Sequence, residues 1–245
     1  MNKINFPNMV YINMDSCVER KDHMENQKEL YNADIKRISA ISDNFDNYSD
    51  DWKLVLNVDN PTNFDNKTHL LSMNEIGCLL SHLEAIRVYG TEDLIVFEDD
   101  VDLSPSQLWQ FSLNDLIEKV RGNVNILQLI KNNAHGPLYI KDHTFDNDWG
   151  TAGYFISKSL CKEIVSKYYI NNKWTLTNLP SNYHRKVADS VIYSFTKTYT
   201  CTIFSLSNFG SSIDSHDYNE YLGKSILKEM SLQGLTLDYY LNSGN

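Results

Sequence analysis

A short, wholly apolar segment of this chain runs directly into a cluster of acidic residues. Residues 94–97 read Leu-Ile-Val-Phe, and the next five residues read Glu-Asp-Asp-Val-Asp. Four apolar residues in a row, with no polar residue between them, predict a strand that is buried on both faces of a sheet. The acids therefore lie at the carboxyl end of a central strand, which is the edge where open α/β sheets bind their ligands.

Other apolar segments alternate with helical stretches, which predicts an α/β fold with a mostly parallel sheet. We expect one domain, because no repeat or linker divides the 245 residues. Asp15 or Ser16 is available to cap the first helix, and residues 42–66, rich in Asp and Asn, are expected to form a long loop. The expected helices are 18–31, 74–89, 108–120, 158–169, 187–196 and 220–232, and the expected strands are 9–14, 94–97, 124–130, 154–156 and 200–206.

The charge balance narrows the classes of partner. The chain has 32 acidic and 22 basic residues, a net charge of −10, which disfavours binding to nucleic acid or to anionic membranes. Metal cations and basic polypeptides remain as suitable partners. We expect a cytoplasmic protein with reduced thiols, because the sequence shows no signal peptide, no membrane-spanning run of about 20 apolar residues, no ER-retention signal and no CxxC pair.

The acidic cluster predicts a metal site. If the extended backbone continues past residue 97, Glu98, Asp100 and Asp102 point to one side and Asp99 to the other. Carboxylates that converge repel one another, and a hard divalent cation such as Mn²⁺ or Mg²⁺ relieves that repulsion. The alternative is a solvated acidic turn in which Asp102 or Ser104 caps the next helix.

Two enzyme chemistries use such a cluster. In nucleotide-sugar transferases an Asp-x-Asp pair holds a metal ion against the diphosphate of the donor. In phosphatases of the haloacid-dehalogenase type, Asp-x-Asp-x-Thr/Ser supplies a nucleophile and an acid, and residues 100–104 have this pattern. The phosphatase is disfavoured, because the chain lacks the later acidic, glycine-containing loop of those enzymes. A non-catalytic carbohydrate-binding module is the third alternative.

Four segments match the motifs of one enzyme family in the same order. Residues 10–15 read Val-Tyr-Ile-Asn-Met-Asp with Glu19-Arg20 downstream, and residues 75–82 read Glu-Ile-Gly-Cys-Leu-Leu-Ser-His. Residues 94–103 carry the acidic cluster, and residues 150–157 read Gly-Thr-Ala-Gly-Tyr-Phe-Ile-Ser. With a weaker match at 188–190, these segments resemble glycosyltransferase family 25, which includes lipooligosaccharide sugar transferases and collagen hydroxylysine galactosyltransferases.

The resemblance implies a GT-A fold, a Rossmann-like sheet flanked by helices with a nucleotide-sugar site at its strand ends. It also implies a UDP-hexose donor, either UDP-glucose or UDP-galactose, and Mn²⁺ (or Mg²⁺) as the cofactor. Asp100 and Asp102 correspond to the metal-holding Asp-x-Asp pair, and His216 is the candidate third ligand unless it is an exposed loop histidine. The nucleotide side spans about 1–105, the acceptor side about 106–220, and a C-terminal helix about 220–232.

Further site residues follow from the same resemblance. Asp189 is the candidate base for an inverting reaction, with Asp148 as its rival, and Trp149 could form a flat wall for an acceptor sugar. Capping of a helix by Asp189 and solvation of Asp148 in a loop are the alternatives. The predicted donor-binding residues are Asn13, Asp15, Arg20, Ser81, His82, Asp99, Gly150 and Thr151. For three of these the alternatives are a helix cap (Asp15), a solvated arginine (Arg20) and a core histidine (His82).

The acceptor is the least constrained part of the prediction. A net charge of −10 suits a lysine-rich, collagen-like polypeptide better than an anionic lipooligosaccharide at a membrane. The Asn-rich composition is similar to that of large-virus members of the family, which glycosylate viral collagens. A viral protein of this kind would be located in the host cell cytoplasm or in the virion. We therefore expect hydroxylysine or galactosyl-hydroxylysine as the acceptor, with an oligosaccharide acceptor as the alternative.

Overall fold

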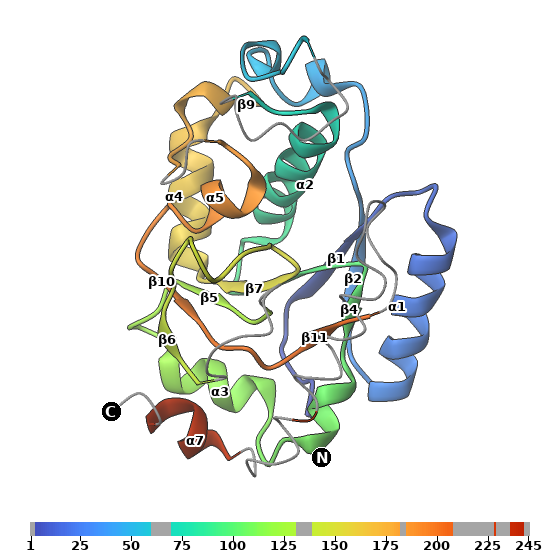
Figure 1. Ribbon diagram of the computed structural model, residues 1–245, viewed down its shortest axis with the longest axis vertical. Helices are drawn as coiled ribbons and strands as arrows, with labels where there is room; N and C mark the ends of the chain where they lie inside the picture. The colour runs from blue at the N-terminus through green and yellow to red at the C-terminus, as the bar shows by residue number, and fades with distance from the viewer. Residues whose placement is uncertain are drawn as a thin grey trace.

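A seven-stranded sheet crosses the middle of the molecule in the order β2-β1-β3-β7-β5-β10-β6 (Figure 1). The computed structural model describes residues 3–59, 70–130, 139–181, 185–207, 228 and 236–242. Five of the strands run in one direction, while β7 is antiparallel to both neighbours and β6 is antiparallel to β10. The strands are β1 (Met9–Asn13), β2 (Ile35–Ser39), β3 (Leu94–Glu98), β5 (Ile126–Gln128), β6 (Lys141–Asp142), β7 (Gly153–Ile156) and β10 (Thr198–Thr200). The predicted α/β fold with a mostly parallel sheet is confirmed.

Helices cover both faces of this sheet (Figure 1). One face packs against α1 (Val18–Tyr31), α3 (Leu113–Val120) and α7 (Leu237–Asn242), and the other packs against α2 (Met73–Tyr89), α4 (Lys158–Tyr168) and α5 (Ala188–Ile192). The short elements are β4 (Val101–Asp102), β8 (Tyr169–Ile170), β9 (Lys173–Trp174), β11 (Ser205–Leu206), η1 (Phe45–Asn47), η2 (Trp52–Leu54), η3 (Ser104–Leu108) and η4 (Leu176–Asn178). None of the helices in the described ranges is long and apolar enough to span a membrane.

The central strands build a separate apolar core on each side of the sheet. In β1 and β3, Val10 and Val96 face the core beneath α2, α4 and α5, while Tyr11 and Phe97 face the core beneath α1 and α3. Successive side chains of a strand point to opposite faces, so a strand that is apolar throughout feeds both cores. All four of these side chains are fully buried, which fixes the position of the acids that follow β3.

Helix α2 is the element that positions the second motif. Its N-terminus is closed by a capping box, in which Ser72 accepts a hydrogen bond from the backbone of Glu75 and Glu75 accepts one from the backbone of Ser72. The helix packs so closely on the loop after β2 that a Cβ atom at Gly77 would lie 2.4 Å from the carbonyl oxygen of Ile41. A glycine is required there because any side chain would push the loop away from the helix.

Several predicted boundaries were wrong. Neither Asp15 nor Ser16 caps α1, because Cys17 is the N-cap residue and gives no side-chain hydrogen bond. The helix predicted over 108–120 begins only at Leu113, after Ser112 and Asp115 form their own capping box. The helix predicted over 187–196 ends at Ile192, and the strand predicted over 200–206 is split into β10 and β11. The helix predicted over 220–232 lies outside the described residues, except for Lys228.

In the predicted loop after β2, the half-buried carboxylate of Asp51 forms hydrogen bonds with residues 125 and 126 positions away in the sequence. Asp51 accepts hydrogen bonds from the hydroxyl of Ser49 (2.6 Å), the backbone N–H of Leu176 (2.9 Å), and the backbone N–H and hydroxyl of Thr177 (2.9 and 2.6 Å). Burial alone would raise the pKa of Asp51, but the hydrogen bonds from Ser49 and Thr177 outweigh it and lower that pKa. The ionised form of Asp51 therefore stabilises the fold.

We expect Asp51→Ala to lower the free energy of unfolding by about 1–3 kcal/mol at pH 7, the cost of losing hydrogen bonds to a charged acceptor. Because the folded pKa is below the unfolded value of about 3.9, this contribution is present above pH 4 and is lost as the pH falls through the folded pKa. Urea unfolding at pH 7 and near pH 3 measures the change. Asp50→Ala is the matched control, since the exposed pair of Asp50 with Lys173 contributes little. Equal effects of Asp51→Ala and Asp50→Ala would contradict the stabilising role of the ionised Asp51.

Candidate active site

A pocket of about 320 Å³ opens where the carboxyl ends of β1, β2 and β3 meet the first turns of α2. Ile12, Met14 and Met73 form an apolar wall, and Arg20 and Glu98 are among its charged residues. Its volume is at the lower end of the range of about 300–1,000 Å³ that is usual for small-molecule sites. The pocket lies at the sheet edge that the sequence predicted.

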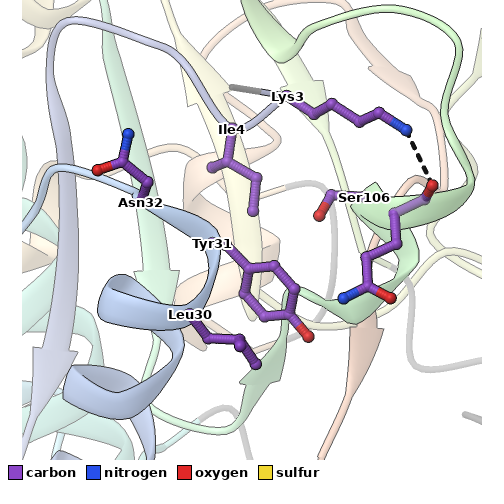
Figure 2. Close-up of a pocket in the computed structure, with 7 residues that line it drawn as sticks. Lys3, Ile4, Leu30, Tyr31, Asn32 and Ser106 are labelled. Carbon is purple, nitrogen blue, oxygen red and sulfur yellow. Dashed lines mark hydrogen bonds between the residues drawn. The ribbon is translucent and has the colours of Figure 1, made fainter. Parts of the chain in front are cut away.

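A second hollow, of about 480 Å³, lies between the end of α1 and η3 (Figure 2). The side chain of Lys3 crosses it and donates a hydrogen bond to the carbonyl oxygen of Gln107 at 2.8 Å. The other lining residues are Ile4, Leu30, Tyr31, Asn32 and Ser106. No carboxylate lines this hollow, so the acid-lined pocket beside β3 is the better candidate for a reaction site.

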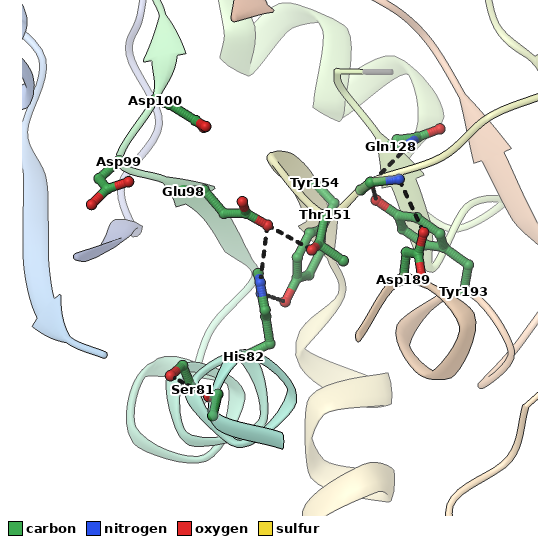
Figure 3. A network of polar contacts seen from close by, with 12 residues as sticks. Ser81, His82, Glu98, Asp99, Asp100, Gln128, Thr151, Tyr154, Asp189 and Tyr193 are labelled. Carbon is green, nitrogen blue, oxygen red and sulfur yellow. Dashed lines mark hydrogen bonds and ion pairs between the residues drawn. The ribbon is translucent and has the colours of Figure 1, made fainter. Parts of the chain in front are cut away.

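Glu98 is the first acid after the buried strand, and it belongs to a polar network (Figure 3). One oxygen, Oε1, accepts a hydrogen bond from the hydroxyl of Thr151 at 2.6 Å and lies 3.4 Å from Nε2 of His82. Nδ1 of His82 shares a hydrogen bond of 3.2 Å with the hydroxyl of Tyr154. Burial alone would raise the pKa of Glu98, but His82 and Thr151 hold it below its ordinary value. The predicted residues Thr151 and His82 thus orient Glu98.

Asp99 and Asp100 follow Glu98 in a turn and point to opposite sides (Figure 3). Asp99 accepts hydrogen bonds from Asn13 (2.7 Å) and from the guanidinium group of Arg20 (2.9 Å). Asn13 also accepts a hydrogen bond from Arg37 at 2.9 Å. The predicted donor residues Asn13, Arg20 and Asp99 therefore contact one another, and Arg20 and Asp99 both line the pocket.

Asp100 is in the opposite situation. Its Oδ1 atom is buried and has no hydrogen-bond partner in the part of the chain that the structure describes, and its nearest cation, Arg20, is 3.6 Å from Oδ2. Burial, and next the negative charge of Glu98, raise the pKa of Asp100 to about 7. A buried carboxylate without a partner is costly unless a cation binds it. The orphaned oxygen of Asp100 is chemically suited to a hard divalent cation, and metal binding by the cluster stays a prediction.

Asp102 is held by the turn that follows it. Its two oxygens accept hydrogen bonds from the backbone and hydroxyl of Ser104 (2.9 and 2.8 Å) and from the hydroxyl of Ser205 (3.0 Å). The predicted alternative, a cap of the next helix by Asp102 or Ser104, is wrong, because the N-cap residue of η3 is Leu103 without a side-chain hydrogen bond. Asp102 is half-buried and keeps free lone pairs. Strand β11, which pairs with β4 beside it, leads toward the segment with His216, which lies outside the described residues. Ligation by Asp102 and His216 stays a prediction.

The expected alternation of the acids holds only in part. The strand ends at Glu98 and turns, so residues 98–102 are not one extended segment. Glu98 and Asp100 still lie close enough for their charges to interact, whereas Asp102 turns toward the two serines. The prediction that Glu98, Asp100 and Asp102 all point to one side is therefore wrong for Asp102, whose carboxylate contacts Ser104 and Ser205 instead.

The loop before β7 carries the predicted acceptor-side residues. Asp189, in the first turn of α5, accepts a hydrogen bond from the backbone N–H of Gly150 at 3.1 Å (Figure 3). Tyr193 donates to the carbonyl oxygen of Gly150 at 2.8 Å, and Gln128 donates to those of Trp149 and Gly150 at 3.0 Å. Gly150 has a φ of +89°, which only glycine adopts without strain. The loop is held rigidly, and the side chain of Trp149 is 57% exposed.

Asp148 lies in the same loop but is buried. Both of its oxygens accept hydrogen bonds from Nζ of Lys141 (2.8 and 2.7 Å), and Oδ2 also accepts one from the backbone of Thr144 (2.9 Å). The solvated loop position that we considered for Asp148 is wrong, because only 2% of the residue is exposed. These contacts favour a structural ion pair for Asp148 over a role as base.

Two other predicted donor-binding residues, Ser81 and Asp15, form hydrogen bonds within the protein. The hydroxyl of Ser81 accepts a hydrogen bond from the backbone of Ile41 and donates one to the carbonyl oxygen of Gly77, at 2.8 and 2.7 Å. It thereby fastens the pocket loop to α2. Asp15 is exposed and pairs with Arg37 and with the hydroxyl of Ser39 (2.8 Å) at the rim formed by β1 and β2.

Sequence reasoning missed one pocket residue with reactive chemistry. Cys78 lines the pocket, and its thiol is accessible there. It precedes His82 by four residues, so the helical period alone places both on one face of α2. The pKa of the Cys78 thiol is raised by desolvation from the protein atoms around the pocket and, in order of size, by the charges of Glu98, Asp189, Glu75 and Asp100. Glu98, which also lines the pocket, is thus the carboxylate with the largest effect on the Cys78 thiol.

Comparisons with known proteins agree with this arrangement. A search of curated proteins gives no match. The family model described as glycosyltransferase family 25 (LPS biosynthesis protein) matches residues 6–179, well over half of the 245-residue chain. The matched range contains β1, α2, β3 and β7, and thus Arg20, His82 and the whole acidic cluster. The chain therefore belongs to glycosyltransferase family 25.

Proposed function

We propose that this glycosyltransferase moves glucose or galactose from a UDP-sugar to a hydroxyl acceptor with the help of a divalent cation. The observation that carries the proposal is the orphaned carboxylate oxygen of Asp100 beside a pocket at the carboxyl edge of the sheet. Asp100 and Asp102 would hold Mn²⁺ or Mg²⁺, with His216 as a third ligand. When bound, the ion would offset the negative charge that develops on the departing nucleotide diphosphate.

The residues of the pocket suit the parts of such a donor. The apolar wall of Ile12, Met14 and Met73 suits the flat face of a uracil ring. Arg20 lines the pocket and pairs with Asp99, and its guanidinium group can bind a diphosphate in addition to Asp99. Glu98, fixed by Thr151 and His82, adds a carboxylate that can accept hydrogen bonds from sugar hydroxyls.

We propose Asp189 as the base that takes the proton of the acceptor hydroxyl in an inverting reaction. Its charge raises the pKa values of Cys78 and Tyr193, which supports a place close to the pocket. One carboxylate oxygen accepts the backbone N–H of Gly150, and the other accepts that of Ser190 at 2.7 Å, so the group is oriented before substrate arrives. Trp149, exposed beside it, would stack on an acceptor sugar.

We expect Asp189→Asn to lower kcat about 10²- to 10⁴-fold with little change in the KM for the UDP-sugar, because a general base acts on the acceptor. Asp148→Asn is the matched control. It breaks the ion pair with Lys141, so it should lower the melting temperature while kcat stays close to the wild-type value. Steady-state kinetics with thermal unfolding of both variants makes the comparison. Full activity of Asp189→Asn would remove it as the base.

For the acceptor we propose hydroxylysine or galactosyl-hydroxylysine in a basic, collagen-like polypeptide. The net charge of −10 supports this choice, because it attracts a lysine-rich chain. The second candidate is a lipooligosaccharide, which the description of the family model, an LPS biosynthesis protein, favours. Collagen-like peptides and oligosaccharides, offered separately to the same enzyme, distinguish the two.

The proposal is tested by UDP release from UDP-glucose and UDP-galactose in separate reactions. Each reaction is run with Mn²⁺ and with a chelator, for the wild type and for Asp102→Asn. We expect release from one donor only with Mn²⁺, and a strong loss in the variant. Release that persists with chelator would overturn the metal-dependent mechanism, and release of phosphate from monoesters in place of UDP would favour the phosphatase chemistry.

A further inference from the structure

A thiol, an imidazole and a carboxylate converge on one side of the pocket. The ligand atoms of Cys78, His82 and Glu98 all lie within 4.8 Å of one another. Cys78 and His82 are one turn apart on α2, and Glu98 ends β3, so two packed elements of the core hold the three groups together. This cluster does not include Asp100 or Asp102, and the proposed function does not use Cys78.

The spacing of these atoms is close to that of a tetrahedral zinc site. With zinc–ligand distances of about 2.0–2.3 Å, a nitrogen and an oxygen ligand lie about 3.3 Å apart, and a sulfur and a nitrogen about 3.6 Å. Nε2 of His82 and Oε1 of Glu98 are 3.4 Å apart. The sulfur of Cys78 lies within 4.8 Å of the other two ligand atoms, so it has to approach by about 1.2 Å at most, a movement that an accessible side chain can make.

The neighbours of the cluster orient it as they orient known metal ligands. A histidine that binds a metal through one ring nitrogen normally forms a hydrogen bond through the other. Nδ1 of His82 meets the hydroxyl of Tyr154 at 3.2 Å, which directs Nε2 toward Glu98 and the pocket. Thr151 donates to Glu98 at 2.6 Å and fixes the carboxylate in the same way. Tyr154 and Thr151 therefore supply the second hydrogen bonds that metal ligands of this kind need.

The ligand set selects a different metal from that of the acidic cluster. Thiolate and imidazole are soft or intermediate ligands and favour Zn²⁺, whereas a set of carboxylates favours Mg²⁺ or Mn²⁺. Three protein ligands leave a fourth coordination position, which in this pocket faces the open volume. A cation there would stand in the space that we assign to the UDP-sugar.

We propose that Cys78, His82 and Glu98 form a second divalent-cation site of the zinc type, separate from the carboxylates of Asp100 and Asp102. We further infer that its occupancy blocks the donor pocket, so that zinc inhibits the enzyme; this second step rests on the proposed function. On binding, the thiol proton of Cys78 passes to solvent and the sulfur binds as the thiolate. No oxidation or reduction is involved.

The site is tested with Co²⁺ alone, added to the metal-free protein. Thiolate ligation gives a sulfur-to-cobalt charge-transfer band in the near ultraviolet, and tetrahedral geometry gives strong visible bands. We expect both at one equivalent of Co²⁺ for the wild type, and their loss in Cys78→Ser. Cys17→Ser is the matched control, because Cys17 lines the same pocket outside the cluster, and it should keep the bands. Asp100→Asn should keep them as well.

The absence of a charge-transfer band in the wild type, or its persistence in Cys78→Ser, would overturn the site. If His82→Gln fails to fold because it is buried, Cys78→Ser still decides, since serine is nearly isosteric with cysteine. This readout needs no transferase activity, so failure of the proposed function would not affect it.

Inhibition is measured separately, as the affinity for UDP in the presence of Mn²⁺ with and without Zn²⁺. We expect Zn²⁺ to weaken UDP binding at least tenfold in the wild type and to leave Cys78→Ser unaffected. If cobalt binds at Cys78 but zinc leaves UDP binding unchanged, the blocking of the donor pocket is wrong and the cation site stands. If UDP does not bind even without Zn²⁺, the proposed function is wrong and the cobalt result still decides the site.

Discussion

Replacing Asp100 by asparagine is expected to abolish Mn²⁺-dependent UDP release while the fold becomes as stable as the wild type or more so. The carboxylate is buried, one of its oxygens has no partner among the described residues, and its pKa is raised to about 7. The protein therefore compensates the charge of Asp100 only in part, through Arg20 at 3.6 Å. Asparagine keeps the shape of the side chain but removes the charge, and with it the reason for a cation to bind.

The expected magnitudes separate the two effects. Loss of the group that neutralises the leaving diphosphate should lower kcat at least about 10²- to 10³-fold. Removal of the buried negative charge should raise the free energy of unfolding, by up to about 3 kcal/mol. Asp102→Asn is the matched control, because it should also lose activity but should lose stability as its hydrogen bonds with Ser104 and Ser205 weaken. Wild-type activity of Asp100→Asn would remove Asp100 from the metal site.

The place of the site could be predicted from the sequence because it depends on local signals. Four apolar residues identified β3 as a buried strand, and the acids that follow it had to lie at the carboxyl edge of the sheet. The second motif was correctly placed on a helix, since the apolar residues of α2 recur at helical spacing and are buried. Position along one strand or one helix is encoded in neighbouring residues.

Strand β2 and the direction of β7 escaped prediction for physical reasons. In Ile35–Ser39 only two residues are apolar and only the first is buried, as is usual for a strand at the edge of a sheet, so the pattern is weak. Strand β7 is as apolar as a parallel central strand, because burial on both faces does not depend on direction. Its reversal is set by the paths of the segments before and after it.

The roles of the individual acids could not be predicted either, because each depends on partners far along the chain. Asp99 meets Asn13 and Arg20, and Asp148 has Lys141 turned toward it by the pairing of β6 with β10. The sequence shows that four acids follow β3, but the tertiary structure decides which of their charges are neutralised by other side chains of the protein. Asp99 and Asp100 are adjacent in the sequence and differ most in this respect.

This contrast predicts that Asp99→Ala, unlike Asp100→Asn, is strongly destabilising. Asp99 is buried and accepts hydrogen bonds from Asn13 and Arg20 at 2.7 and 2.9 Å. Its removal leaves a half-buried guanidinium group and a buried amide that each lose a partner. We expect the free energy of unfolding to fall by about 2–4 kcal/mol, measured by guanidinium chloride unfolding. Asp22→Ala, an exposed acid on the same helix as Arg20, should change it by less than about 0.5 kcal/mol.

A double-mutant cycle between Asp99 and Arg20 tests the cause of that loss. If the ion pair accounts for it, Asp99→Ala should cost much less in an Arg20→Met background, because the guanidinium group that would lose Asp99 is already absent there. Equal costs in the two backgrounds would assign the loss to Asn13 instead. Either result of the cycle is compatible with a stabilising effect of Asp100→Asn. If Asp99→Ala and Asp100→Asn destabilise the fold equally, the proposed difference between Asp99 and Asp100 is wrong. In that case the protein would not neutralise Asp99 more fully than Asp100, and the orphaned oxygen of Asp100 would no longer distinguish the two acids.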